Sequence, residues 1–431
     1  MSHLPAPPLA GETSPARPLG AIPSRQIVQL SIYWFGISAI WGGINNVVLQ
    51  RRMDDLAGPA NAGTALALLT IAGAIVAVLV QPTVGSLSDY TISRWGRRKP
   101  YIAVGAVLDV AFIVGIATSQ TYLSLLAFVV LLQFSSNVAQ GPFQGYVPDL
   151  VPAKQVGLAS ALLGLMTLFG RIGGVVIASI GLGTGDFAPS LIGLGLIELT
   201  TALVTLRYVQ EGPPPVHRGG RSWLRIALSA WGLDILRERS FVWLLGSRLC
   251  VLMASVMLVD LMLFYLRRSL ALTDQETAVW INVSSVVIAL AVGLTMYPAA
   301  RLSDRVGRKR VIYASCAIGA FGMAGVVVAP TVVVALLFAV PVGIAAGAFL
   351  TVDWALMTDV IPKAASGRYM GISNVVTAGA GPLAIALGGV TMDRVGAFDF
   401  AAGPRAAFAL SLLFYALGAL LLRPVDERRR E

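Results

Sequence analysis

Four amide side chains lie on one face of a single apolar segment, residues 121–147. Gln133, Asn137, Gln140 and Gln144 are spaced by 4, 3 and 4 residues, which at 3.6 residues per turn aligns them along one side of a helix. An unpartnered amide in hydrocarbon costs several kcal/mol, so the row must either bond to neighbouring helices or line a water-filled cavity. Amide donors and acceptors suit a hydroxyl-rich ligand, and we predict that this row contacts a substrate.

Six ionisable side chains also lie within apolar segments, and they are Asp109, Arg171, Glu198, Arg248, Asp260 and Asp353. Each would cost about 2.5–3.5 kcal/mol at a lipid-facing helix centre, so each must pair or face water. Small residues around Arg171 permit close helix approach. Its guanidinium could therefore bind a substrate oxygen, tune a nearby carboxylate or form a structural pair.

One polar pattern occurs twice in the chain. Leu87-Ser88-Asp89 precedes Gly96-Arg97-Arg98-Lys99, and Leu302-Ser303-Asp304 precedes Gly307-Arg308-Lys309-Arg310. The Asp residues of the two copies are 215 positions apart (304 − 89), and a later pair, Asp149 and Asp359, is 210 apart (359 − 149). Carboxylates beside Arg at helix ends can lock helices together and release them. The spacing predicts a membrane protein of two matched halves.

Hydropathy defines the elements that must position these groups. Of the 431 residues, 56% are hydrophobic and 13% charged, with a mean hydropathy of +0.77, which excludes a water-soluble domain. Segments of about 20 apolar residues can cross a bilayer. We predict twelve of them, at 27–50, 62–84, 100–118, 121–147, 156–182, 188–208, 241–266, 275–299, 311–329, 331–357, 367–392 and 404–423.

The positions of these segments divide the chain into five predicted parts. A disordered cytoplasmic tail (1–26) precedes a six-helix half (27–208), a cytoplasmic linker with an amphipathic helix (209–240), a second six-helix half (241–423) and a short tail (424–431). With the N-terminus inside, inner segments hold 24 Lys and Arg and outer loops hold 6. The positive-inside rule then places both termini in the cytoplasm.

Several other functions are excluded by what the sequence holds. The net charge of +10 is scattered over short loops, so we expect no nucleic-acid partner. The two Cys and two His suggest neither a disulfide framework nor a metal site, and we expect no cofactor. The chain lacks the GxxxxGK[ST] phosphate loop of ATP-driven transporters. Energy for transport would then come from a gradient.

The loop containing Gly85, Asp89, Arg94, Arg97 and Arg98 resembles the signature loop of the major facilitator superfamily, and the copy at 301–310 lies where that family's second copy belongs. The resemblance implies an all-α membrane protein with twelve transmembrane helices in two six-helix pseudo-repeats. It also implies a cytoplasmic gate, made by these five residues and by Asp149, Asp304, Arg308 and Asp359.

A narrower resemblance is to the glycoside-pentoside-hexuronide and sucrose-proton symporters. It rests on the long form of the first loop and on the run from Asn137 to Pro142 that leads to Asp149. That branch usually carries an Asp seven residues before the Gln of Gln-Gly-Pro and an Arg four residues after it. This chain has Gln133 and Gln144 at those positions. The usual proton acceptor is absent, so proton symport by that residue is not implied.

When the twelve segments are numbered in chain order, the family's layout places helices 1, 4, 7 and 10 around the cavity. This layout implies roles for the remaining charged and polar residues. Asp260 and Arg248 share helix 7, and Asp353 lies toward the inner end of helix 10, so these three are the expected ion-coupling groups. Asp109 and Glu198, on peripheral helices, are expected to pair structurally. Further substrate contacts are expected from one amide and two rings that could stack on a sugar, namely Asn45, Trp41 and Trp354.

The leading prediction is a secondary active transporter of the inner membrane that moves a sugar or glycoside by alternating access, coupled to protons. We expect it to lie in the lipid bilayer, to work as a monomer on a small-molecule substrate and not to be an enzyme. An exporter of amphiphilic compounds would need a more apolar cavity. A third possibility is a protein of the same fold that transports nothing and serves in pigment handling or assembly. In such a protein Arg171 and Asp353 would be buried in closed helix pairs, whereas in a transporter they would face an aqueous cavity.

Overall fold

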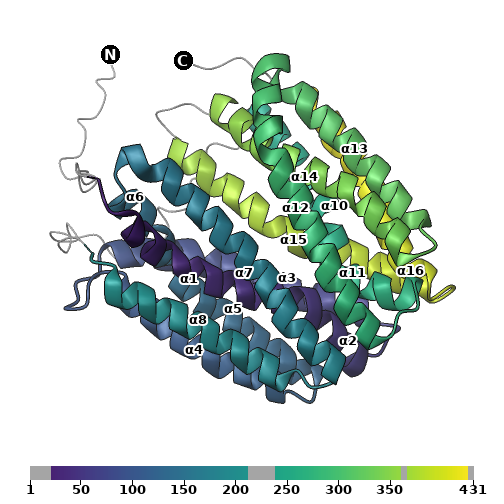
Figure 1. The fold of residues 1–431 in the computed structure, drawn as a ribbon, viewed down its shortest axis with the longest axis horizontal. Helices are drawn as coiled ribbons and strands as arrows, with labels where there is room; N and C mark the ends of the chain where they lie inside the picture. The colour runs from purple at the N-terminus through teal and green to yellow at the C-terminus, as the bar shows by residue number, and fades with distance from the viewer. Residues whose placement is uncertain (1–20, 212–237, 361–365, 426–431) are drawn as a thin grey trace, which may run out of the picture.

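Long helices dominate the computed structural model, which describes residues 21–211, 238–360 and 366–425 (Figure 1). Twelve helices of this described part are long and apolar enough to cross a membrane, so the predicted spans are confirmed. Most of the predicted first tail, the amphipathic linker helix and most of the second tail lie outside the described residues.

The first half is a bundle of six long helices. They are α1 (Ser24–Gly43), α3 (Ala62–Asp89), α4 (Lys99–Thr118), α5 (Tyr122–Gln144), α7 (Val156–Thr184) and α8 (Ala188–Tyr208). The span that begins with α1 continues through a π-helical segment, Ile44–Val48, into α2 (Leu49–Leu56). A short α6 (Tyr146–Leu150) follows α5.

The second half repeats this arrangement. Its long helices are α10 (Arg239–Asp260), α12 (Asp274–Val306), α13 (Arg308–Val328), α14 (Val332–Val360), α15 (Ser366–Gly396) and α16 (Ala402–Leu422). The predicted seventh span, 241–266, is interrupted at Leu261 and continues through α11 (Met262–Phe264) into a second π-helical segment, Tyr265–Ser269. The first span of each half thus contains a π-helical stretch, a feature that often marks functional sites.

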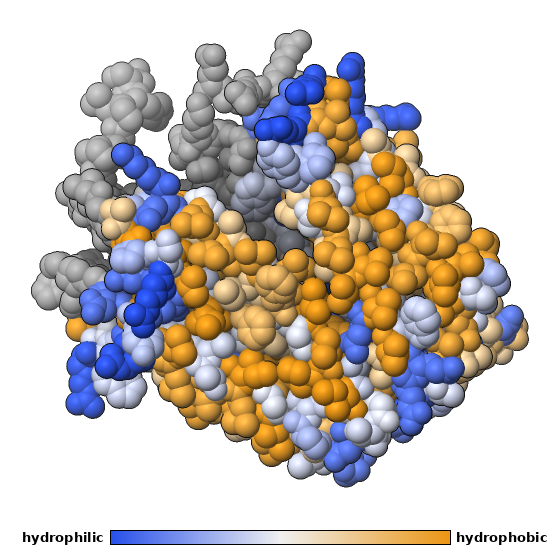
Figure 2. All heavy atoms as spheres, viewed as in Figure 1, coloured by the Kyte–Doolittle hydropathy of each residue, from blue (hydrophilic) through white to orange (hydrophobic). Residues whose placement is uncertain are grey.

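The surface of the bundle matches a membrane environment. Figure 2 shows apolar residues over the middle of one face and hydrophilic residues gathered toward its two ends. We call the end at which α3 and α12 finish, with Asp89 and Asp304, the latch end. The other end, with loops 57–61 and 261–273, is the opposite end.

The two halves pack through two pairs of helices, α3 with α15 and α7 with α12 (Figure 1). Small residues allow the first pair to approach closely: a Cβ on Gly389 would lie 2.8 Å from the carbonyl carbon of Gly63. Close backbone packing at glycine is typical of helix contacts in membranes, where no hydrophobic effect drives helices together.

Both Leu-Ser-Asp triplets form the last turn of a helix. The Ser88 hydroxyl donates to the Gly85 carbonyl at 2.7 Å, and the Ser303 hydroxyl donates to the Ala300 carbonyl at 2.8 Å. The helices therefore run past the predicted span ends at residues 84 and 299. In both copies the next motif glycine adopts a positive φ, +109° at Gly96 and +98° at Gly307, a conformation that favours glycine.

Candidate functional site

A cavity of about 220 Å³ lies where α7 of the first half meets α10, α12 and α14 of the second. Most of its wall is aliphatic, with Leu, Ile and Val side chains from these helices. The polar residues that reach it are Asn46, Arg171, Ser255, Ser284 and Ser285. A concave, largely apolar space with a few polar groups is the usual form of a small-molecule site. This cavity is therefore the candidate substrate site.

Arg171 and Asp260 form an ion pair that joins the two halves beside this cavity. The Arg171 Nη2 lies 3.3 Å from the Asp260 Oδ1. The Arg171 side chain is 50% exposed, whereas that of Asp260 is 11% exposed. A guanidinium carries five N–H donors, so Arg171 can hold Asp260 and still offer donors to a ligand. The structure thus brings a predicted substrate residue together with a predicted coupling carboxylate.

The π-helical segment of the first span presents Asn46 to the same cavity. Asn46 is buried, and neither its Oδ1 nor its Nδ2 has a hydrogen-bond partner among the described residues. The neighbouring Gln50 Nε2 instead donates to the backbone carbonyls of Asn46 and Asn45, at 3.0 and 3.3 Å. An unpartnered buried amide is costly. A ligand hydroxyl in the cavity would satisfy it.

The predicted row of amides on α5 bonds largely within its own helix. Asn137 Nδ2 donates to the backbone and side-chain oxygens of Gln133, at 2.7 and 3.2 Å. Gln140 Nε2 donates to the Ser136 hydroxyl at 2.8 Å, and the Trp41 indole of α1 donates to the same hydroxyl at 3.3 Å. Trp41 thereby bridges α1 and α5. The partners of Asn137 and Gln140 thus lie on α5 itself, and not on a neighbouring helix as one of the two alternatives expected.

A second cavity, of about 430 Å³, lies between the halves nearer the latch end. Its wall includes Trp34 of α1, Gln81 of α3, Gln144 of α5 and Thr377 of α15. Gln144 is thus the member of the predicted amide row that lines a described cavity. Polar and aromatic groups from both halves make this space a candidate vestibule to the substrate site.

The other two predicted ion-coupling groups, Arg248 and Asp353, form a closed pair within the second half. Arg248 Nη1 binds Asp353 Oδ2, and the two side chains are 5% and 3% exposed. Arg248 also donates from Nη2 to the Thr377 hydroxyl of α15 at 2.9 Å. The Trp354 ring centroid lies 5.9 Å from the guanidinium carbon. Asp353 therefore sits in a buried helix contact, as the assembly alternative expects, whereas Arg171 faces a cavity, as transport expects.

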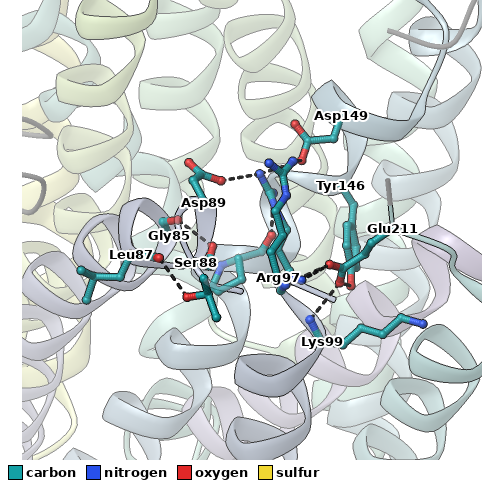
Figure 3. Close-up of polar contacts among 12 residues, drawn as sticks. Gly85, Leu87, Ser88, Asp89, Arg97, Lys99, Tyr146, Asp149 and Glu211 are labelled. Carbon is teal, nitrogen blue, oxygen red and sulfur yellow. Dashed lines mark hydrogen bonds and ion pairs between the residues drawn. The ribbon is translucent and has the colours of Figure 1, made fainter. Parts of the chain in front are cut away.

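The repeated loop is organised within each half. In the first half, Arg98 Nη2 lies 2.7 Å from both Asp89 Oδ1 and Asp149 Oδ2, and Arg97 pairs with Asp149 as well (Figure 3). A Cβ at Gly145 would overlap the Arg98 guanidinium, so a glycine makes room for this network. The predicted gate residues Asp89, Arg97, Arg98 and Asp149 thus connect α3, α4 and α6.

The second copy has the same plan. Arg308 lies 2.7 Å from Asp304 and 3.4 Å from Asp359, and it donates to the Ser303 hydroxyl at 2.6 Å. Gly85 lies at the contact of α3 with α5, where its Cβ would be 3.4 Å from the Gly141 carbonyl oxygen. Arg94 is exposed and forms no ion pair among the described residues. Within the described residues, the ion pairs of both copies stay inside their own halves.

Glu211, just after α8, completes the first copy. Its carboxylate accepts the backbone N–H groups of Arg97, Arg98 and Lys99, at 2.5, 3.0 and 2.9 Å, and the Tyr146 hydroxyl at 2.7 Å (Figure 3). A carboxylate at the first turn of a helix satisfies its free N–H groups and its dipole. Glu211 thus ties the chain that leaves the first half to the start of α4.

Besides the Arg171–Asp260 pair, ion pairs between the halves lie at the opposite end. Asp54 of α2 binds Arg268 at 2.5 Å and also pairs with Arg267. Asp274, at the start of α12, lies 3.3 Å from Arg51 of the first half, and it also lies 2.7 Å from Arg267 of its own half. Asp393 of α15 accepts the N–H groups of Gly63 and Thr64 of α3, at 3.1 and 2.6 Å. We call the pairs of Asp54 and Asp274 the outer lock.

Asp54→Asn is expected to open the opposite end, because Asp54 is the shared acceptor of two Arg side chains from the other half. A hydrogen bond to a charged group contributes about 1.5–3 kcal/mol, so losing the carboxylate should raise the ratio of open to closed molecules about tenfold or more. Pulsed electron paramagnetic resonance between spin labels at the exposed Ala60 and Gln275 would measure this.

Asp55→Asn is the matched control for this variant. Asp55 pairs with Arg51 on its own helix, four residues earlier, and does not reach the second half. We expect its distance distribution to equal that of the parent protein. A parent-like distribution in Asp54→Asn, or the same broadening in both variants, would contradict the outer lock.

Sequence patterns missed two parts of this site and the local structure of a third. Asn46, like Asn45, is a weaker candidate from the sequence, and the π-helical segment that contains it has no sequence marker. In the sequence, Asp54, Arg267 and Arg268 are only charged residues near predicted loops. Their pairing could not be predicted because the partners lie 213 or 214 residues apart. Glu211 lies beside the Pro-rich start of the linker, and its bonds to α4 depend on the folded bundle.

Comparisons with known proteins agree with this architecture. A family model described as Major Facilitator Superfamily matches residues 30–384 and 262–431. A bacterial homolog of the human lysosomal transporter Spinster, in an inward-facing and occupied conformation, superposes with a TM-score of 0.74 at 15% identity, covering 94% of this chain and 97% of that chain. A D-xylose-proton symporter superposes with a TM-score of 0.66 at 18% identity, covering 94% and 98%.

Curated relatives match over shorter stretches. Sucrose transport protein SUT1 of Oryza sativa subsp. japonica is 30% identical over 124 residues, which is 24% of this chain and 23% of the relative. Proton-associated sugar transporter A of Homo sapiens is 30% identical over 169 residues, which is 33% of this chain and 23% of the relative. The chain thus spans about a quarter of the length of these relatives. Through its family-model match and its twelve spans in two repeated halves, this chain belongs to the major facilitator superfamily and is a multi-pass membrane protein.

Proposed function

We propose that this transporter moves a sugar or glycoside across the inner membrane by alternating access, coupled to protons. The observation that carries the proposal is the cavity between the halves, where an unpartnered amide at Asn46 and the half-exposed Arg171 offer hydrogen bonds to hydroxyl groups. The curated relatives named above are a sucrose transport protein and a proton-associated sugar transporter, which favours the same class of substrate.

The arrangement of ion pairs supports one state of an alternating-access cycle. The outer lock holds the halves together at the opposite end, while the larger cavity lies nearer the latch end. If both termini are cytoplasmic, as the Lys and Arg distribution predicts, this state faces inward. Outward opening would then require the outer lock to break and the latch ends of the halves to approach. One chain holds both halves of the pathway, so we propose a working monomer.

Arg171 and Asp260 are the groups that link substrate to this movement in our proposal. They belong to opposite halves, and their separation of 3.3 Å is set by how the halves meet. A sugar hydroxyl can donate to Asp260 and accept from Arg171, so substrate would compete with the direct pair and shift the balance between conformations. The amides of α5 and the Trp41 indole would support the wall of the pathway.

The aliphatic wall favours a second candidate, transport of amphiphilic compounds. Leu, Ile and Val residues make up much of the cavity between α7, α10, α12 and α14, and free sugars present hydroxyls on every side. A glycoside with an apolar aglycone would satisfy both the polar groups and the aliphatic wall. An amphiphile without a sugar would use the wall and the Arg171 charge alone.

Thermal unfolding with a panel of ligands separates these candidates. The protein would be placed in lipid nanodiscs, because maltoside detergents are themselves glycosides. A ligand at 100 times its Kd stabilises the folded state by about 2.7 kcal/mol, which raises Tm measurably. We expect sugars or alkyl glycosides to raise Tm in the parent protein and not in Asn46→Ala. A rise only with amphiphiles that carry no sugar would replace the leading proposal with the second.

A further inference from the structure

Two buried carboxylic acids meet inside the first half. Asp109 of α4 and Glu198 of α8 are both fully buried, and their carboxyl groups contact each other. Ser135 of α5 donates its hydroxyl to Asp109 Oδ1, and Tyr33 of α1 donates to Glu198 Oε1 at 3.2 Å. The other two oxygens, Asp109 Oδ2 and Glu198 Oε2, have no partner among the described residues.

Positive charge is missing from the surroundings of this pair. The titratable group that faces the carboxyls from the packed helices is Tyr33, and no Arg or Lys of the described residues pairs with either acid. Asp260 and Asp353, the other predicted intramembrane acids, each pair with an Arg. Two ionised carboxylates in contact, buried without a cation, would repel each other and lose their hydration.

A proton resolves this arrangement. Ionised carboxylates only accept hydrogen bonds, so the contact between Asp109 and Glu198 becomes a hydrogen bond when one of them carries a proton. The serine and tyrosine donors occupy one oxygen of each acid, and the other two oxygens, Asp109 Oδ2 and Glu198 Oε2, are free to share that proton.

The pair is also placed to affect the moving parts of the bundle. Gly36 of α1 packs on α8 so closely that its Cβ would lie 2.7 Å from the Glu198 Cα. The same α1 presents Trp34 to the second cavity, and its span continues to Asn46 in the substrate cavity. The Tyr33 ring contacts Phe143, which lines the second cavity, with centroids 5.1 Å apart. One side chain therefore separates Tyr33 from that space.

We propose that Asp109 and Glu198 form a proton-binding site that takes up and releases one proton in each transport cycle, exchanging it with the second cavity past Tyr33. This inference rests on the proposed proton coupling. It assigns a proton-carrying group to a chain whose α5 has Gln133 at the position where the related symporters usually carry an Asp. Proton loss would leave two facing charges, which would push α8 and α4 apart and weaken the contact of α8 with α1.

Infrared spectroscopy tests proton binding without any substrate. A protonated carboxyl has a carbonyl stretch separate from that of a carboxylate, and in the parent protein we expect such a band to titrate reversibly with pH. Glu198→Gln and Asp109→Asn should lose it. Asp399→Asn is the matched control, because Asp399 is exposed and caps a turn through the N–H groups of Ala401 and Ala402, and it should keep the band. Persistence of the band in both acid variants would overturn the proposal.

Tyr33→Phe guards against a loss caused by misfolding. It keeps both carboxyl groups and removes one donated hydrogen bond, so the band should remain with a displaced midpoint. Loss of the band in Tyr33→Phe would overturn the proposal, because both acids would still be present.

Sugar transport in proteoliposomes then tests coupling. Glu198→Gln should exchange labelled for unlabelled sugar at rates near those of the control but lose at least about tenfold in accumulation driven by a proton gradient. Accumulation equal to that of the control would overturn the coupling role. If neither parent nor control moves any sugar while the infrared band still behaves as expected, the proposed function fails and the proton site stands.

Discussion

Arg248→Met is expected to destabilise the protein by about 3–5 kcal/mol, because it would leave Asp353 as an unpaired charge in a buried helix contact. The pair is 5% and 3% exposed, and Arg248 also holds the Thr377 hydroxyl of α15. One substitution therefore weakens the junction of α10, α14 and α15. The measurement is the apparent Tm in detergent, read from intrinsic fluorescence.

A double variant separates charge burial from packing. Replacing both partners, Arg248→Met with Asp353→Leu, should recover most of the lost Tm, because buried ion pairs are often replaceable by apolar groups of similar volume. Arg394→Met is the matched control, since Arg394 is exposed near the end of α15 and forms no ion pair among the described residues. A double variant no more stable than Arg248→Met alone would show that Asp353 is not paired as described.

Arg171→Gln and Asp260→Asn are expected to reduce sugar uptake about tenfold to a hundredfold while leaving a folded protein. The Arg171 guanidinium is half exposed beside the cavity, so its loss disturbs no closed helix packing, and Asp260→Asn removes the charge of the more buried partner together with the pair. A charged hydrogen bond contributes about 1.5–3 kcal/mol, which corresponds to that range of affinity. Initial uptake rates in proteoliposomes, corrected for the amount of folded protein, are the readout.

Exchanging the charges distinguishes a substrate role from a structural one. Arg171→Asp combined with Asp260→Arg keeps an ion pair between the halves. If the pair only joins the halves, the exchanged variant should recover uptake. We expect it to remain as impaired as the single variants, because substrate would meet a carboxylate where it needs a guanidinium. Recovery to parent rates would contradict the assignment of Arg171 to substrate binding.

The fold was largely predictable because two strong signals agree. Hydropathy defines spans long enough to cross a bilayer, and the doubled Leu-Ser-Asp pattern sets them in two matched halves. The span ends were less predictable. α3 runs to Asp89, five residues past the predicted end (89 − 84), and α12 runs to Val306, seven residues past it (306 − 299), while the interruption at Leu261 has no proline or glycine to mark it.

The site was predictable only in part, since helical periodicity orders residues on one helix but does not pair helices. The spacing on α5 aligned Gln133 with Asn137, and these two do bond to each other. Asp260 pairs with Arg171, 89 residues away, and Asp353 pairs with Arg248, 105 residues away. Helical periodicity can predict neither pairing. These pairings place Asp260 beside the substrate cavity and Asp353 in a closed contact.

Sugar accumulation in proteoliposomes tests the central proposal most directly. Labelled sugars and glycosides would be offered with an inward proton gradient, with a protonophore, and without any gradient. The account predicts that at least one of them accumulates above its external concentration under the gradient, that the protonophore abolishes this, and that Arg171→Gln loses it. Failure of every sugar and glycoside to accumulate under any gradient would contradict the account.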